Sequence, residues 1–405
     1  MAEPFKLQNW EKGANNLHSA DRLPAGFVRS AVNVDPLPGG RLSLRSGFER
    51  IYDGTAVRGM LALGRKLLIA DGTDLVEFDT TTNSARVLRT IAGAGGFCGD
   101  VMNDRLYFCT ANEALEYDGT AVRPWSVPDV LYQPAVMAQP GGTLLAGYYQ
   151  IAVTYVDVWG REGGTDKPVI VWADAGSQLL ISLPTLPPGC VANVYVSPNE
   201  AATLYFQQQV DYPHTVAIGG LRDDTARCDT ILKRAVQPGQ IVRAHNAVLL
   251  CAADRLLQMT EPFAPHLVDR ARGFFQFPAP IGEVSSNGKP AVAHVSADKH
   301  YALTTPETDG TGQDVVLEYP AIPGTGVKLP DGRGAWMTQY GQVVMNGAEV
   351  QSLNRETYAP VKADAGAAGV LDANGNQLIV TTVRGNNTPN PLAAADFYIG
   401  EILNP

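Results

Sequence analysis

Two glycine-rich segments come nearest, by residue type and spacing, to binding a phosphate. Gly93–Gly99 reads GxGxxxG, where a dinucleotide-binding loop requires GxGxxG, and no helical pattern follows it. Gly282–Lys289 resembles a P-loop, but its glycine spacing is one residue too long. Pro290 also stands where a Ser or Thr would bind magnesium. Both segments are therefore predicted to be turns, and no cofactor is expected.

The segment Asp372–Asn376, with the sequence Asp-Ala-Asn-Gly-Asn, has the alternating oxygen ligands of a calcium loop. It lacks the downstream glutamate that would bind calcium through both oxygens. Asn-Gly between two apolar strands is instead typical of a β-hairpin turn, which is the interpretation we favour. The acidic turn with Asp71, Asp74 and Asp79 is interpreted in the same way, so no metal site is predicted.

Side chains that could act in catalysis are scattered. The six histidines include no HxH or HExxH pair. His294 and His300 are six positions apart, with Ser296 and Asp298 between them, and we expect no metal site there. No GxSxG motif is present, which removes the commonest signal of a serine hydrolase. A carboxylate pair for glycoside hydrolysis would have to come from distant strands, with these residues available: Glu162, Asp223, Asp224 and Glu261. Such residues more often lie in turns, so the sequence predicts no catalytic residue and no enzyme.

The composition disfavours several classes of protein. Gly 41 and Pro 28 among 405 residues exceed the usual share, which favours short strands and turns over helix bundles. The net charge of −10 would repel a polyanion, so a general nucleic-acid binder is disfavoured. The longest apolar run, Ala247–Ala253, is far shorter than the ~20 residues that span a bilayer. Because the start also lacks the pattern of a signal peptide, we expect synthesis in a reducing cytoplasm, no membrane anchor, and five reduced cysteines in core strands.

An internal repeat is the most informative feature of the chain. Leu67–Asp79 and Leu106–Asp118 align without a gap at an offset of 39 residues, each with an apolar strand, a polar turn and an alternating strand. Val248–Met259 fits the same register as a third copy, and Ala335–Asn346 is a looser copy whose turn is shortened to Tyr340-Gly341. A hairpin unit that repeats every ~40 residues has the size of a β-propeller blade.

Hairpins of this kind predict an all-β protein with a β-propeller-like body of about five or six small blades. Four of them begin near residues 67, 106, 248 and 335, and two more lie within Lys299–Tyr319 and Gly369–Val383. A single small sheet cannot bury both of its faces, whereas stacked blades bury one another's faces. The alternative is an ordinary β-sandwich whose hairpins resemble one another by chance.

The repeat is interrupted between its second and third copies, which predicts an inserted domain. Residues 129–233 hold alternating strands such as Gly147–Val156, separated by turns such as Asp157–Arg161. Short strands of this kind are typical of an immunoglobulin-like or fibronectin III-like β-sandwich. The predicted organisation is an extended N-terminal arm at 1–50, first propeller blades at 51–128, the inserted β-sandwich at 129–233 and the remaining blades at 234–405.

The N-terminal arm contains an ordered series of short motifs: Gly13-Ala-Asn-Asn16, Leu23-Pro-Ala-Gly26, Arg29-Ser-Ala-Val-Asn-Val-Asp35, Gly39-Gly-Arg-Leu42 and Arg45-Ser-Gly-Phe48. This series resembles the opening of bacteriophage virion tail proteins. The blade hairpins and the segment Tyr155–Glu162 extend the resemblance loosely over most of the chain. Some members of this group are similar to the tail-tube or nozzle proteins of short-tailed phages, in which a β-propeller body repeats around the channel through which DNA leaves.

This resemblance implies a structural protein of the virion tail, assembled in the cytoplasm of the bacterial host, that lines a DNA exit channel. Its partners would be copies of itself in a homo-oligomeric ring, such as a hexamer, and other tail proteins such as an adaptor and fibres. Double-stranded DNA would pass through the ring without sequence-specific binding. A channel of this kind should not grip phosphates, and the net charge of −10 is compatible with that requirement.

Contacts with partner proteins are expected from the arm and from one exposed turn. Residues 1–50 carry seven basic and five acidic side chains, in contrast to the acidic remainder. Trp159, at the tip of the turn before Arg161, could anchor a partner, or it could pack on its own sandwich. The candidate contact residues are Asn15, Asn16, Arg22, Arg29, Arg41, Arg45, Trp159 and Arg161.

A second hypothesis, from another class of function, is a glycan- or receptor-binding β-propeller, including a glycoside-active tail component. Its blade loops would form a pocket at the central channel, and the inserted sandwich could bind glycan. The feature that would distinguish this hypothesis is a group of acidic and aromatic side chains that converge on the axis of the propeller.

Overall fold

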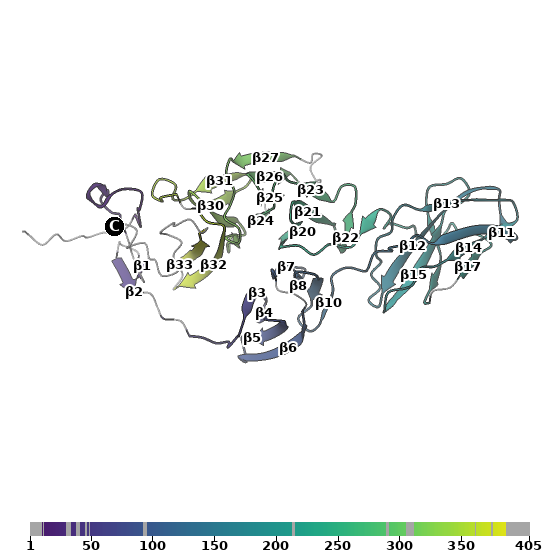
Figure 1. Ribbon diagram of the computed structural model, residues 1–405, viewed down its shortest axis with the longest axis horizontal. Helices are drawn as coiled ribbons and strands as arrows, with labels where there is room; N and C mark the ends of the chain where they lie inside the picture. The colour runs from purple at the N-terminus through teal and green to yellow at the C-terminus, as the bar shows by residue number, and fades with distance from the viewer. Residues whose placement is uncertain are drawn as a thin grey trace, which may run out of the picture. The chain divides into compact units, whose positions relative to one another are not determined.

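The computed structural model describes residues 10, 12–29, 34–37, 41–44, 47, 49–91, 95–212, 215–288, 291–304, 312–360, 362–373 and 376–385. In these residues the regular structure is β-strand apart from one short 3₁₀ helix, η1 (Ala20–Arg22), and the strands form small sheets (Figure 1). Contacts divide the chain into two compact units, Thr55–Gln276 and Met1–Gly54 together with Phe277–Pro405.

In two small sheets of the unit Thr55–Gln276, and in most of a third, strands that follow one another in the chain lie side by side, which is the strand order of propeller blades. The first sheet contains β3 (Val57–Leu63), β4 (Lys66–Asp71), β5 (Asp74–Asp79) and β6 (Ser84–Thr90). The second contains β7 (Cys98–Met102), β8 (Arg105–Cys109), β9 (Ala114–Tyr117) and β10 (Val122–Pro124). The third contains β18 (Lys233–Arg234), β19 (Ile241–His245), β20 (Val248–Ala253), β21 (Leu256–Glu261), β22 (Ala264–Asp269) and β23 (Phe274–Gln276).

These three sheets bury one another's faces. Successive side chains of strand β8 point to opposite faces of its sheet, and both faces are covered. Leu106 and Phe108 belong to a core that the second sheet shares with the first. Tyr107 and Cys109 belong to another core, shared with the third sheet. The second and third sheets are therefore adjacent, and the residues between them in sequence are an insertion into the connection of neighbouring blades.

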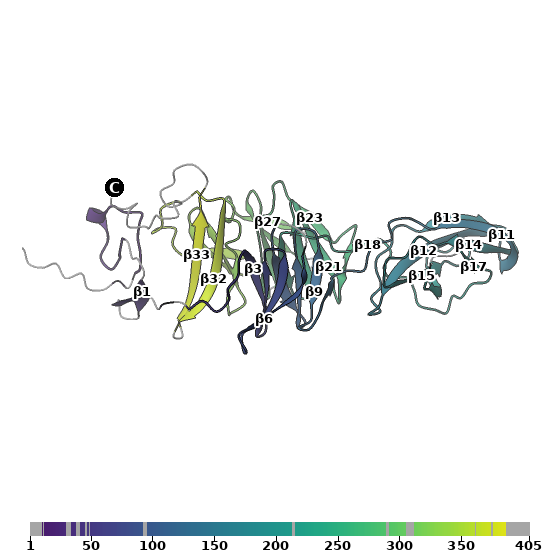
Figure 2. The same ribbon diagram turned by 60° about the horizontal axis from the view of Figure 1, so that its bottom comes forward.

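The other unit holds two more sheets of the same order and two hairpins. One sheet contains β24 (Glu283–Gly288), β25 (Ala291–Ser296), β26 (His300–Thr304) and β27 (Gln313–Leu317), and the next contains β28 (Val327–Lys328), β29 (Gly334–Thr338), β30 (Gly341–Asn346) and β31 (Glu349–Ser352). The strands β32 (Ala365–Ala373) and β33 (Asn376–Arg384) run side by side as a long hairpin (Figure 2). In the arm, β1 (Val34–Leu37) pairs with β2 (Arg41–Leu44).

The chain is thus an all-β protein with a β-propeller-like body, as the sequence predicts. Each hairpin expected from the repeat is present as a strand pair: β4–β5, β8–β9, β20–β21, β26–β27, β29–β30 and β32–β33. The tips of the Gly93–Gly99 loop and of the Asn374-Gly375 turn include residues that lie outside the described ones.

Two details of the predicted repeat are wrong. In the first sheet the turn lies between the paired residues Asp71 and Asp74, and in the third between Ala253 and Leu256. The third copy is therefore displaced by one residue from the register that the sequence alignment gave, and a displacement of one residue exchanges the two faces of a strand. The fourth copy pairs Thr338 with Gly341, so its turn has two residues like the first and is not shortened.

The insertion forms two antiparallel sheets that pack on a shared core (Figure 1). One sheet has the order β11 (Ala135–Leu144), β14 (Ser177–Ser182) and β17 (Thr215–Ile218). The other has the order β13 (Val169–Ala173), β12 (Gly147–Asp157), β15 (Cys190–Val196) and β16 (Tyr205–Val210). These strands lie within the expected range 129–233, and the immunoglobulin or fibronectin III character of the domain stays a prediction.

Four of the five cysteines lie in strands, and the exception is Cys228, which lies in the segment after β17. Cys109 and Cys251 approach to 4.0 Å between their Sγ atoms in the core that the second and third sheets share. Burial raises the pKa of Cys228 to about 11, so this thiol stays protonated at neutral pH.

Buried histidines make this fold sensitive to acid. Burial lowers the pKa of His245 to about 4, and it also lowers the pKa of His266, His294 and His300. A histidine whose pKa is lowered in the folded state takes up its proton more readily when the chain is unfolded. Its contribution to stability is therefore complete above pH ~6.5 and is lost as the pH falls toward its folded pKa.

For His245 alone, we expect the free energy of unfolding to fall by about 3 kcal/mol between pH 7.5 and pH 4. Urea unfolding at a series of pH values, with His245→Gln beside the wild type, measures this contribution as the difference between the two curves. The exposed His18, changed to Gln, is the control for the loss of a histidine side chain that is not buried. Parallel curves for His245→Gln and wild type would contradict the expectation.

Candidate interaction site

The turn Asp157–Arg161 joins the inserted domain to the second blade sheet. Its aspartate accepts hydrogen bonds through Oδ1 from the backbone N–H of Trp159 (3.0 Å) and of Arg161 (2.9 Å), which closes the turn. The Arg161 guanidinium then donates to the backbone carbonyls of Trp125 (2.9 Å) and Pro124 (3.0 Å). One side chain of the inserted domain thus holds the segment that leaves the blade.

The carboxylate at the centre of this joint is Glu116 of β9, which is 3 % exposed. It faces the Nη1 atoms of Arg161 at 3.2 Å and Arg105 at 3.5 Å, and it also contacts Arg123 of β10. Burial raises the pKa of Glu116, while the positive charges of Arg161 and Arg105 act in the opposite direction. The buried charge is tolerated because the arginines compensate it.

The first repeat carries a buried carboxylate at the equivalent position, Glu77, which is 6 % exposed. Arg86 donates to it from Nε at 2.9 Å and from Nη2 at 3.0 Å. The hydroxyl of Tyr117, which belongs to the second sheet, also donates to Glu77. The same position of the repeat therefore links blade to blade in one copy and blade to inserted domain in the next.

Trp159 lies over the joint and is 49 % exposed. The guanidinium carbons of Arg123 and Arg161 lie 5.0 and 5.2 Å from its ring centroid, within the range of cation–π interactions. The two sequence-based alternatives for this residue were an anchor for a partner protein and packing on its own sandwich. The structure shows contact with arginines of both the blade and the inserted domain, and the role of the half-exposed ring as an anchor stays a prediction.

The four-stranded sheet of the inserted domain leaves one end of its outer face open. At the other end, Ala152 and Tyr195 are buried beneath Leu204 and Cys228. Three large side chains at the open end are strongly exposed: Tyr148 (53 %), Ile170 (63 %) and Trp172 (49 %). The backbone pairing places Tyr148 opposite Trp172 and Gln150 opposite Ile170, so these residues form a compact patch across β12 and β13.

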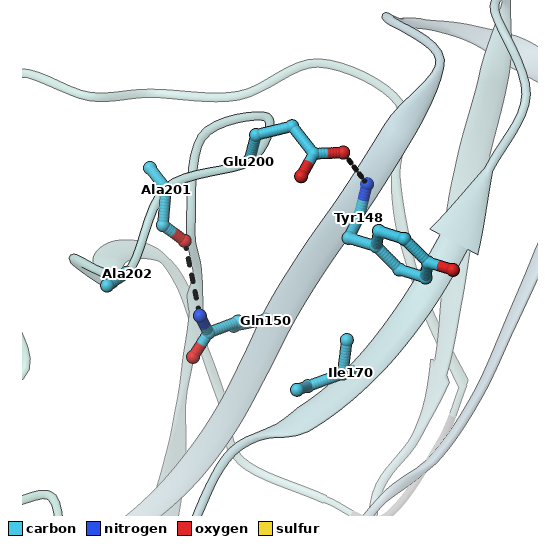
Figure 3. A pocket seen from close by; sticks show the side chains of 6 residues that line it. All are labelled: Tyr148, Gln150, Ile170, Glu200, Ala201 and Ala202. Atoms are coloured by element: carbon cyan, nitrogen blue, oxygen red, sulfur yellow. Dashed lines mark hydrogen bonds between the residues drawn. The ribbon is translucent and has the colours of Figure 1, made fainter.

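A pocket of about 340 Å³ opens beside this patch. Its wall on one side is the patch itself, and on the other side it is the loop after β15 (Figure 3). The residues that line it are Tyr148, Gln150, Ile170, Glu200, Ala201 and Ala202. Aromatic and aliphatic surface therefore meets one amide and one carboxylate in a small concave space, which is the usual composition of a ligand pocket.

The loop wall is fastened to β12 by hydrogen bonds on both backbone and side chain. Glu200 donates from its backbone N–H to the carbonyl of Tyr148 (3.0 Å), and its Oε1 accepts from the Tyr148 N–H (3.0 Å). Gln150 donates from Nε2 to the carbonyl of Ala201 at 3.3 Å, as Figure 3 shows. Glu200 adopts a left-handed backbone conformation with φ 57°, which is uncommon for a residue with a side chain.

Gly147 is needed where this loop crosses the start of β12. A Cβ atom at this position would collide with Asn199 Oδ1 and lie 2.9 Å from Glu200 Oε1. We expect Gly147→Ala to displace the loop, lower the free energy of unfolding by about 1–3 kcal/mol and open the pocket wall. Amide hydrogen exchange of the loop, together with thermal unfolding, measures both effects.

Gly96→Ala is the matched control, because a Cβ atom there meets nothing within 4 Å. It is expected to change the stability by less than about 0.5 kcal/mol. If the loop amides were as protected in Gly147→Ala as in the wild type, the position of the loop would not depend on the absence of a side chain at residue 147.

Two of the arm residues expected to contact a partner are used inside the chain. Asn15 is 2 % exposed, and its Oδ1 accepts from the N–H of Leu17 and from His18 Nδ1, both at 3.1 Å. The prediction that the Asn15 side chain contacts a partner is therefore wrong, since this side chain is enclosed by its own turn. Asn16 accepts through Oδ1 from the N–H of Ala359 at 2.7 Å, within the same compact unit.

The basic residues of the arm differ in exposure. The side chain of Arg22 is 82 % exposed and lies 3.9 Å from Asp21, and Arg41 is also exposed. Arg29 is half-buried, and Arg45 lies outside the described residues. Arg22 and Arg41 are thus accessible to a neighbouring protein, and their role as contacts stays a prediction.

The carboxylates considered for catalysis are dispersed, whereas the rings of His294 and His300, which were considered for a metal site, lie with their centroids 5.4 Å apart. Glu162 accepts from Tyr195 Oη at 2.7 Å, Glu261 pairs with Lys233 at 2.8 Å, and Asp223 and Asp224 are exposed. Among the described residues, no group of three His, Cys, Asp or Glu side chains is placed to hold a metal ion. No helix in this part of the chain has the length and apolar character needed to cross a membrane.

No motif in the sequence points to the patch residues Tyr148, Ile170 and Trp172, or to Glu200. The available signal was the presence of Tyr148 and Trp172 at outward positions of alternating strands. That signal is weak, because the same aromatic residues occur at buried positions of a sheet covered on both faces.

No protein-family model matches the chain, and no curated protein matches it. Among solved structures, the chain is similar to the β-propeller domain of Cps50 (Swd1) from Myceliophteria thermophila, with 8 % identity and a TM-score of 0.33 over 78 % of this chain and 90 % of that one. It is also similar to the C-terminal WD40 domain of Sif2, with 10 % identity and a TM-score of 0.32 over 76 % and 72 %. Similarities at such low identity indicate a likeness of fold and say nothing of function.

Proposed function

We propose that this chain is a non-enzymatic structural component of a bacteriophage tail. In this proposal the β-propeller-like body forms a homo-oligomeric ring with other copies, contacts further tail proteins and lines a channel for DNA. The proposal rests on the ordered N-terminal series, and one structural observation supports it.

The observation is that residues of the series take part in backbone hydrogen bonds and turns within the arm. The N–H of Val28 donates to the carbonyl of Gly13 (2.8 Å), and the N–H of Asn15 donates back to the carbonyl of Val28 (2.9 Å). Gly13 and Gly26 have φ angles of 76° and 89°, which glycine adopts most easily. Three residues of the series, Gly13, Asn15 and Gly26, thus take part in the conformation of the arm, which supports the proposal.

The arm is also attached to the C-terminal part of its unit. Asn16 donates from its N–H to the carbonyl of Thr357 (3.0 Å) and accepts from Ala359 through its side chain. Arg22 and Arg41 are exposed on the arm. Exposed basic side chains suit recognition of an acidic neighbour, here proposed to be another copy of this chain, whose net charge is −10.

Immunogold labelling of purified particles from the source host, with antibody raised against this chain, tests the proposal. Gold at the tail is the expected result, and its position at the head–tail junction or at the tip would distinguish a nozzle from an adsorption role. Pre-immune serum is the control. Unlabelled particles, with the protein left in the soluble fraction, would remove the virion proposal.

A further inference from the structure

The open end of the outer face of the inserted domain carries a site that the tail proposal does not explain. Tyr148 and Trp172 lie opposite each other on β12 and β13, with ring centroids 5.0 Å apart and an interplanar angle of 75°. Each ring is about half exposed. Ile170 and Gln150, the next outward pair, continue the patch toward the pocket.

The aromatic rings are held in place before any ligand arrives. Trp172 Nε1 donates to Oδ1 of Asp174 at 3.1 Å, which orients the indole, and its edge-to-face contact with Tyr148 orients the phenol ring. The opposite wall is fixed by the hydrogen bonds of Glu200 and Gln150 to their neighbours. A site whose groups are already ordered loses little conformational entropy when it binds a ligand.

We propose that this site binds a neutral saccharide. A sugar ring presents C–H groups on one face and hydroxyls at its rim. The C–H face suits the exposed rings of Tyr148 and Trp172. The hydroxyls suit the carboxylate of Glu200 and the amide oxygen of Gln150, which line the pocket (Figure 3). The volume of about 340 Å³ admits one sugar unit, and the exposed aromatic pair extends the surface for a second.

The charge at the pocket selects among saccharides. Glu200 is the one charged residue among those that line the pocket, and it is acidic. A carboxylate accepts hydrogen bonds from hydroxyl groups and repels carboxylate and phosphate substituents. Neutral oligosaccharides are therefore expected to bind better than sialylated ones. A protein partner is a poorer fit, because a specific interface takes roughly 800 Å² from each partner, far more than a pocket of this size offers.

Saturation-transfer NMR with the purified full chain tests the proposal. The probes are lactose, cellotetraose and N,N′,N″-triacetylchitotriose, with 3′-sialyllactose as the charged counterpart of lactose. We expect transfer to at least one neutral probe and weaker transfer to 3′-sialyllactose than to lactose. Trp172→Ala and Tyr148→Ala are each expected to weaken binding at least ten-fold.

Tyr132→Ala is the matched control, since Tyr132 is also an exposed tyrosine (75 %) and does not line the pocket. The two patch variants change exposed side chains, so their melting temperatures should equal that of the wild type. Absence of transfer to all three neutral probes would overturn the proposal, as would binding that is unchanged in both patch variants. The test uses isolated protein, so its result and the labelling of particles stand or fall separately.

Discussion

Arg161→Ala is expected to lower the free energy of unfolding by about 3–5 kcal/mol, the usual cost of removing one partner from a buried ion pair. The substitution removes the guanidinium from Glu116, which is 3 % exposed, and leaves the carbonyls of Trp125 and Pro124 without their donor. It also removes a positive charge that lowers the pKa of Glu116, so this pKa should rise further.

The pH dependence of the loss distinguishes this explanation from simple loss of packing. A carboxyl group whose pKa is raised in the folded state costs stability when it is ionised, and this cost disappears as the pH falls below the unfolded value. The difference between Arg161→Ala and wild type should therefore be larger at pH 7 than at pH 4.5 in urea unfolding.

Arg272→Ala is the control, because Arg272 pairs with Asp269 at 3.5 Å with its side chain 87 % exposed. Exposed ion pairs of this kind contribute ~0–1 kcal/mol. If Arg161→Ala cost no more than Arg272→Ala, the joint between the inserted domain and the second sheet would not depend on the buried carboxylate.

Trp336→Ala is expected to have a comparable effect in the other compact unit, with a loss of about 3–5 kcal/mol. Trp336 of β29 is fully buried and packs with Val343 and Met345. Its ring also stacks on His300, with centroids 4.1 Å apart and an interplanar angle of 17°. The alanine variant would leave a large cavity and expose the neutral His300 to water.

Chemical unfolding followed by circular dichroism measures this loss. Trp336→Phe keeps an aromatic ring on His300 and should cost about 1–2 kcal/mol, because less volume is removed. A smaller effect of alanine than of phenylalanine would contradict the packing explanation. Because the cavity would admit water to His300, the pKa of this histidine should move back toward its ordinary value, so we expect the free energy of unfolding of the alanine variant to depend less on pH than that of the wild type.

The two repeats show how the insertion is accommodated without loss of the blade. Glu77 and Glu116 occupy the same position, 39 residues apart, and both are buried beside basic side chains. Tyr117 of the next sheet donates to Glu77, whereas Arg161 of the inserted domain reaches Glu116. The carboxylate of the second repeat thus has an ionic partner that the insertion itself brings.

The hairpins, their repetition and the place of the insertion can be predicted from the sequence alone. These features are local, since apolar alternation and turn residues within about twelve positions decide a hairpin. The offset between Leu67–Asp79 and Leu106–Asp118 was correct because both turns fall at the same place relative to their strands. The third copy was misaligned by one residue because apolar residues on both faces give no signal of which face is which.

Which surfaces contact one another is visible in the tertiary structure and not in the sequence pattern. Trp159 and Arg161 read as an exposed turn, yet Arg161 reaches Glu116, which comes 45 positions earlier in the chain. Tyr148 and Trp172 read like other outward strand residues, and their exposure depends on where the segment around Leu204 and Cys228 ends. The pattern of a strand shows which side chains share a face, but the free energy of covering that face comes from residues that are distant in sequence.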